Sequence, residues 1–119
     1  MTVAEFRRLA LSLPETTEGA HHGYTDFRVA GRIFASLGYP TNEFAVVNLT
    51  PQDQDFLLRA HADVLAPVPN KWGASGSTTV RLAKARRSSV VEALEAAWRR
   101  RAPKRLVASL ENANPGANT

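Results

Sequence analysis

Residues 24–37, YTDFRVAGRIFASL, contain the pattern on which the fold prediction depends. The aromatic and β-branched residues of this segment predict two strands, one over 24–30 and one over 33–37. Between them, Gly31 and Arg32 fit a two-residue turn, because a type II′ turn needs a positive φ at its first central position. The segment is therefore predicted to be an antiparallel hairpin.

The neighbouring segments extend this hairpin into a sheet. Residues 43–49 and 77–83 contain the aromatic and β-branched residues that are typical of strands. For the three consecutive strands 24–30, 33–37 and 43–49, an antiparallel meander is the simplest arrangement. The segment 15–23, ETTEGAHHG, is polar and carries glycines, so it is predicted to be a loop. Prolines and glycines also predict an ordered loop over 66–76, around Trp72.

Capping patterns predict three helices, over 2–13, over 50–61 and from residue 89 onward. The capping residues are Thr2 with Glu5, Thr50 with Pro51, and Ser89 with Glu92. The third helix carries an apolar stripe that is predicted to be core: Val90, Val91, Leu94, Ala97 and Trp98. Pro103 either kinks this helix or begins a short last helix that ends at Leu110.

Length and composition are those of a single soluble domain. The 119 residues include no cysteine, which excludes disulfides, thiolate metal sites and cysteine nucleophiles. The sequence shows no N-terminal signal pattern and no apolar run of about 18 residues, so a cytoplasmic protein without membrane contact is expected. Residues 1–110 are predicted to form the domain and residues 111–119 a flexible C-terminal tail.

Positive charge is concentrated in one segment. Residues 81–105 hold nine Arg and Lys against two Glu, a net charge of +7, whereas residues 1–80 hold six against eight acidic residues. Such a segment attracts phosphates or acidic surfaces, although basic residues also serve as solubilising groups. The helix dipole accounts for cations at the end of the third helix but not for those that precede it, namely Lys84, Arg86 and Arg87.

The usual sequence patterns of catalysis and metal binding are not found. The chain has no G-x-G-x-x-G or P-loop pattern, and residues 73–76 lack the spacing of a G-x-S-x-G nucleophile elbow. His21 and His22 are adjacent, so in an extended chain they point to opposite sides and cannot both ligate one metal without a bend. No catalytic residue, metal ligand or cofactor is therefore predicted.

The order of three motifs is similar to that of a known family. The motifs are HHGYTDFRVAGRIFASLG at 21–38, KWGASGSTTVRL at 71–82 and APKRLV at 102–107. With this order and spacing the chain resembles the MmcQ/YjbR family over nearly its whole length. The resemblance implies a CyaY-like (frataxin-like) α+β fold, an antiparallel sheet of about four to five strands with helices packed on one face. It also implies DNA binding through a double-wing arrangement of hairpins.

The function expected from charge and resemblance is non-enzymatic DNA binding, chiefly to phosphates and without base-specific reading. By position, the resemblance places Arg28 and Arg32 in the first wing, and Lys71, Trp72 and Arg81 in the second marked segment. The other cations expected to contact phosphates, with release of counterions, are Lys84, Arg86, Arg87, Arg99, Arg100, Lys104 and Arg105.

A second hypothesis belongs to a different class of function. In it Trp72, His22 and Tyr24 line a pocket beside residues 71–76 that binds a small molecule or another protein. Salt separates the two hypotheses, because contacts with DNA phosphates weaken steeply as the salt concentration rises. The sequence gives no indication of the oligomeric state.

Overall fold

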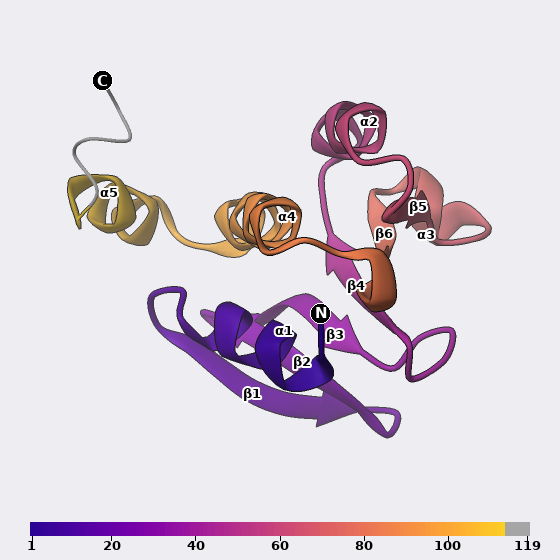
Figure 1. Cartoon of the computed structure of the whole chain (residues 1–119). Coiled ribbons are helices and arrows are strands. Elements are labelled where there is room, and N and C mark those ends of the chain that lie inside the picture. Colours follow the sequence, from indigo (N-terminus) through magenta and orange to yellow (C-terminus); the bar gives the residue numbers. More distant parts are fainter. Residues whose placement is uncertain (114–119) are drawn as a thin grey trace.

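The structure, a computed structural model, describes residues 1–113 as an α+β fold (Figure 1). Its helices are α1 (Val3–Leu11), α2 (Pro51–Ala60), α3 (Lys71–Ala74), α4 (Arg87–Arg101) and α5 (Lys104–Ala113), with a 3-10 turn η1 (Leu82–Lys84). Its strands are β1 (Thr16–His21), β2 (Tyr24–Val29), β3 (Arg32–Leu37), β4 (Phe44–Asn48), β5 (Leu65–Pro67) and β6 (Ser77–Arg81).

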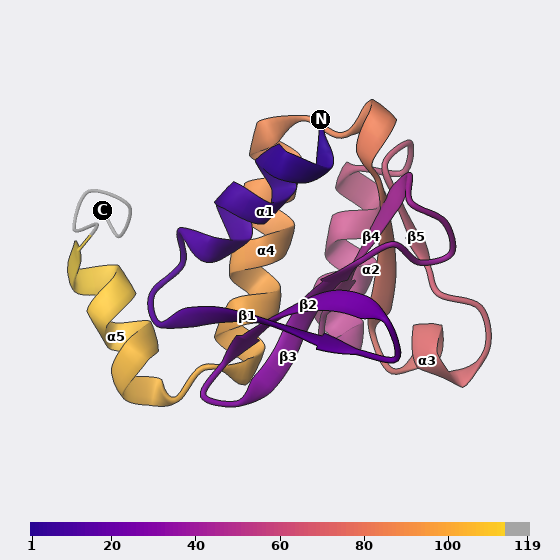
Figure 2. The ribbon, with the colours of Figure 1, turned by 90° about the horizontal axis from the view of Figure 1, so that it is seen from below.

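The six strands form one antiparallel sheet in the order β1-β2-β3-β4-β6-β5. The helices α1 and α4 lie side by side on one face, where α4 contacts β3 and β4 and α1 contacts β1 (Figure 1). In the view of Figure 2 the strands β1 to β3 lie in front of α4, so their other face is turned away from these two helices. Within residues 1–113, no helix combines the length and the apolar character that crossing a membrane requires.

The expected α+β class is confirmed, but the expected number of strands is wrong. The segment 15–23 is not a loop: β1 pairs with β2 over its whole length, from Thr16 opposite Val29 to His21 opposite Tyr24. As an edge strand, β1 is held by backbone hydrogen bonds and buries little, so it has no apolar pattern. The short strand β5 and the helix α3 likewise replace much of the loop expected over 66–76.

The turn between β2 and β3 lies one residue earlier than the sequence predicts. Its central residues are Ala30 and Gly31, with φ of 52° and 77°, and Arg32 already belongs to β3. Positive φ at both positions is the requirement of a type I′ turn, which matches the twist of a hairpin. His22 and Gly23 make the same kind of turn between β1 and β2, with φ of 49° and 80°.

The predicted starts of α1 and α2 are confirmed, whereas that of α4 is displaced. The side chains of Thr2 and Thr50 accept backbone hydrogen bonds from the third residue of α1 and α2. In α4 the N-cap is Arg86, and Ser89 lies at the third helical position, where its hydroxyl accepts from the backbone N–H of Arg86. Ser89 is therefore not the N-cap, because the N-cap lies three residues before the predicted position.

Pro103 begins a separate helix. The helix α4 ends at Arg101, and α5 runs from Lys104 to Ala113, three residues past the predicted end at Leu110. Proline favours this break because it has no N–H to donate to the preceding turn. The remaining residues of the predicted tail, 114–119, lie outside the described residues.

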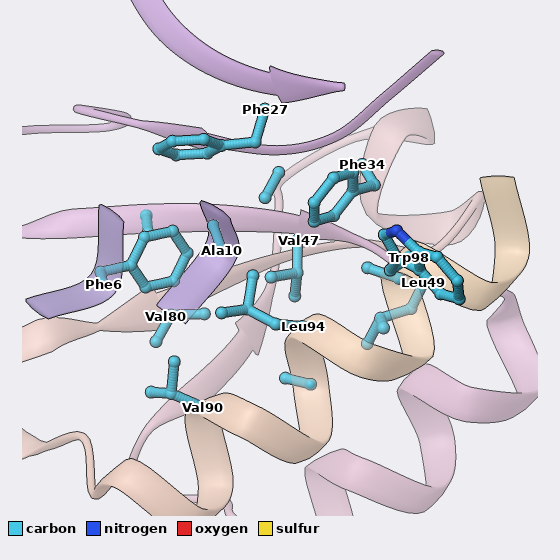
Figure 3. Packing of buried hydrophobic residues seen from close by; sticks show 14 of the residues in the cluster. Phe6, Ala10, Phe27, Phe34, Val47, Leu49, Val80, Val90, Leu94 and Trp98 are labelled. Carbon is cyan, nitrogen blue, oxygen red and sulfur yellow. The ribbon is translucent and has the colours of Figure 1, made fainter. Parts of the chain in front are cut away.

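The core lies between α1, α4 and the sheet (Figure 3). Trp98 of α4 is fully buried, and its indole N–H donates to the carbonyl of Pro14 at 3.0 Å. Phe6 of α1 packs on Phe27 of β2, with ring centres 6.2 Å apart. Four members of the predicted stripe of α4 are confirmed as core, whereas the fifth, Val91, is half-buried and does not belong to the core cluster.

Candidate functional site

A groove of about 930 Å³ lies on the face of the sheet that α1 and α4 leave open. Strands β1 to β4 and β6 contribute to it, together with α3 and the C-terminal end of α4. Side-chain alternation explains this placement. In β4, Ala45 and Val47 belong to the core, so Val46 and Asn48 line the groove.

Asp26 of β2 lies on the groove side of the sheet but is fully buried. Phe27 and Val29 of the same strand point into the core, which leaves Asp26 and Arg28 on the opposite side. The carboxylate of Asp26 accepts hydrogen bonds from Arg28 Nε at 2.8 Å, from Arg28 Nη2 at 3.0 Å and from His21 Nδ1 at 2.9 Å.

These contacts keep Asp26 ionised. The hydrogen bond from Arg28 is the largest influence and lowers the pKa of Asp26 below its ordinary value of 3.8; burial opposes this effect, and His21 adds to it. Asp26 in turn raises the pKa of Arg28. The charges of Asp26 and Arg28 therefore compensate each other inside the protein.

Three arginines converge at the other end of the groove. Arg32 begins β3, and Arg100 and Arg101 end α4. None of the three forms an ion pair with another residue of the described chain. Burial lowers the pKa of Arg101, the nearby positive charges of Arg100 and Arg32 lower it further, and its buried Nε has no hydrogen-bond partner among residues 1–113. Arg100 donates a hydrogen bond to the backbone carbonyl of Leu49, but no carboxylate of the described chain offsets the positive charge at this end of the groove.

Trp72 of α3 lies on the rim of the groove and is 61% exposed. The position of α3 is fixed by two close approaches of the backbone. A Cβ atom at Gly73 would lie 1.8 Å from the carbonyl oxygen of Val68, and one at Gly76 would lie 1.8 Å from that of Leu49. Only glycine fits at these positions, so α3 lies directly against the strands and presents Trp72 at a fixed place.

More aromatic rings line the end of the groove where β2 begins. Tyr24 and Tyr39 meet edge to face with their ring centres 6.4 Å apart, and the ring of His21 lies 6.2 Å from that of Tyr24. Tyr24 pairs with His21, and five residues further along β2, Val29 pairs with Arg32. At about 3.3 Å per residue the two ends of the groove are about 16 Å apart.

The structure brings together part of the predicted DNA-contacting set. Arg28, Arg32, Trp72 and Arg100 line the groove, and Lys71 lies beside it with its Nζ 5.9 Å from the ring centre of Trp72. All three residues named for the alternative pocket also line the groove, namely Trp72, His22 and Tyr24. The two hypotheses thus lead to the same surface.

The remaining cations of residues 81–105 are spread over other parts of the molecule. Arg81 lies over the ring of Phe44 at 5.7 Å, and Arg105 of α5 pairs with Glu15 at 3.5 Å. Three others lie at the start of α4 or just before it: Lys84, Arg86 and Arg87. Arg99 lies near the other end of this 15-residue helix, about 20 Å away, and Lys104 begins α5. The charged segment therefore does not gather at one place.

Sequence reasoning missed several residues of the groove, among them Tyr39, Arg101 and His21. Arg101 is one of three consecutive arginines, and only the packing of α4 separates it from its neighbours. From the sequence, His21 is considered only as a candidate metal ligand. The signal that was available is the His22–Gly23 turn, because it makes residues 16–21 a strand and brings His21 alongside β2.

Comparison with known proteins supports the fold. A family model described as YjbR matches residues 11–100. The crystal structure of the Deinococcus radiodurans protein DR2400, which carries a DUF419 domain, has a similar fold with a TM-score of 0.64. The two chains are 21% identical, and the similarity covers 82% of this chain and 75% of the other. No curated protein matches the sequence.

Proposed function

The chain belongs to the YjbR family, and we propose that it is a binding domain for a ligand that combines phosphate groups with a flat base. Such a ligand is either a free nucleotide or a single strand of nucleic acid, and the groove on the open face of the sheet is its site. The observation that carries the proposal is that three arginines without acidic partners and several exposed aromatic rings line the same groove.

The arginines support the phosphate part of the ligand. Bringing Arg32, Arg100 and Arg101 together without a carboxylate raises the free energy of the unliganded protein, because like charges repel and burial disfavours a cation. A phosphate group removes both costs, since it accepts hydrogen bonds from guanidinium groups in a matching planar geometry.

The aromatic residues support the base. Every nucleobase has a flat face that stacks on an aromatic side chain regardless of sequence, and each such stack stabilises binding by about 1–3 kcal/mol. Trp72 lies on the rim of the groove, while Tyr24 and Tyr39 line the end where β2 begins. The volume of about 930 Å³ is at the upper end of the range for small-molecule sites.

The test is a titration of the isotope-labelled protein at low salt, followed by nuclear magnetic resonance. Pyrophosphate, adenosine triphosphate, a short oligothymidylate and a short DNA duplex are the four probes. We expect the first three to bind and to shift the side-chain signal of Arg32, and Arg32→Ala to weaken their binding several-fold. If none of these three binds, the proposal is wrong.

The arms of the titration separate the two sources of the ligand. Tighter binding of the oligothymidylate than of the nucleotide, with a salt slope of about 0.7 per contacted phosphate, identifies a nucleic-acid strand. Equal or tighter binding of the nucleotide identifies a free small molecule. Arg86→Ala is the matched control, because it removes one exposed arginine outside the groove. Binding that depends on Arg86 and not on Arg32 would overturn the groove as the site.

A further inference from the structure

The proposed phosphate contacts give no role to the residues at the opposite end of the groove. At that end, His21 is held by a hydrogen bond with the buried carboxylate of Asp26. We propose that His21 is a specificity residue for the ring end of the ligand, and that its Nε2 accepts a hydrogen bond from an N–H group of the base. This inference rests on the proposed function and adds to it an orientation: phosphates at the arginines, base at His21.

The hydrogen bond with Asp26 determines which nitrogen of His21 is available. Asp26 is ionised and accepts only, so the Nδ1 that lies 2.9 Å from its Oδ2 must carry a proton. In the neutral ring the other nitrogen, Nε2, is then an acceptor. The side chain of His21 is 37% exposed and lines the groove, so its Nε2 is within reach of a ligand.

The surroundings of Asp26 show that this arrangement is built into the sheet. Burying a carboxylate costs several kcal/mol unless hydrogen bonds and an opposite charge compensate it, and here Arg28 supplies both. Gly19 of β1 lies opposite Asp26 and leaves the necessary room: a Cβ there would be 3.1 Å from both Asp26 Oδ1 and Arg28 Nε. Asp26 is thus a positioning residue for His21.

The length of the groove agrees with this orientation. About 16 Å of β2 separates the His21 end from the Arg32 end, so one ligand reaches both only if its anionic and ring portions lie at opposite ends. Nucleoside triphosphates and short strands meet this condition. At the His21 end the base would lie near Tyr24 and Tyr39, whose rings line the same part of the groove.

The first experiment compares adenosine triphosphate with purine riboside triphosphate, which differs only by loss of the exocyclic amino group. We expect wild type to bind adenosine triphosphate about 2- to 10-fold more tightly, the contribution of one hydrogen bond. His21→Ala should abolish this preference and leave pyrophosphate binding unchanged. A preference that is absent in wild type, or that persists in His21→Ala, would overturn the inference.

The second experiment measures the tautomer of His21 from its ring ¹⁵N signals without ligand. Wild type should carry its proton on Nδ1. In Asp26→Ala the acceptor of the Nδ1 proton is lost, so the ring is no longer held in one tautomer and the preference for the amino group should weaken. A proton on Nε2 in wild type contradicts the inference, even if Asp26→Ala fails to fold. Pyrophosphate binding reports separately on the proposed function, because it does not involve His21.

Discussion

The two ends of the groove use charge in opposite ways. At one end Asp26, Arg28 and His21 form a closed set, in which the carboxylate accepts three hydrogen bonds and its charge is compensated. At the other end Arg32, Arg100 and Arg101 lie together without a carboxylate, and one buried guanidinium nitrogen has no partner in the described chain. The first set stabilises the fold, whereas the second leaves a cost that a ligand can remove.

The difference shows that a count of charges along the sequence does not locate a binding site. Arg28 and Arg32 are four residues apart on one hairpin, but of these two arginines only Arg32 remains without an acidic partner among the described residues. The role of an arginine depends on whether the fold places a carboxylate beside it.

The largest effect is expected from removing the uncompensated charge. Arg100→Ala with Arg101→Ala should weaken pyrophosphate binding about 10- to 100-fold, because hydrogen bonds to charged groups contribute about 1.5–3 kcal/mol each. Arg86→Ala with Arg87→Ala removes the same charge from the other end of α4 and should change binding less than 2-fold. Calorimetric titration at low salt measures both, and equal losses would refute the contrast between clustered and dispersed arginines.

The next effect tests the compensated end. Asp26→Ala should lower the free energy of unfolding by about 2 kcal/mol, because Arg28 and His21 lose their shared acceptor. Pyrophosphate binding by the folded fraction should not weaken, because the loss of Asp26 leaves Arg28 as a further uncompensated positive charge in the groove. Urea denaturation provides the measurement, with Gln52→Ala at an exposed position of α2 as a control expected within about 0.5 kcal/mol of wild type. If Asp26→Ala leaves the free energy of unfolding unchanged, the carboxylate does not contribute to stability.

A smaller change of opposite sign is expected at Arg101. Arg101→Met keeps the apolar stem and removes a buried donor without a partner, together with the repulsion from Arg100 and Arg32. The free energy of unfolding should rise by about 1 kcal/mol while pyrophosphate binds more weakly. Arg99→Met, at an exposed position of the same helix end, is the control. A loss of stability in Arg101→Met would mean that its charge already has compensation.

The smallest effect concerns pH. Because the pKa of Asp26 is lowered in the folded protein, its contribution is complete above the ordinary value of 3.8 and is lost as the pH falls through the lower folded value. The stability difference between wild type and Asp26→Asn should therefore shrink when urea denaturation is repeated at pH values below 3.8. A difference that stays constant would indicate that Asp26 does not titrate differently in the folded and unfolded states.

The predictable part of the molecule is the part with local signals. The helix starts at Thr2 and Thr50 and the β2–β3 hairpin follow from capping and strand composition, and the structure has them. The strand β1 escapes prediction because an edge strand needs only backbone pairing, and its side chains carry no pattern. The groove depends on β1 and on where α4 ends against the sheet, so its full set of residues follows only from the three-dimensional fold.

The two contacts of 1.8 Å that a methyl group would make at Gly73 and Gly76 have a consequence for selectivity. The wall that carries Trp72 has no room to retreat, since its backbone already touches the carbonyls of Val68 and Leu49. An oversized substituent arriving from that side meets a rigid barrier and is turned away. Widening the groove on this side would require movement of the segments that directly follow β4 and β5, where Leu49 and Val68 lie.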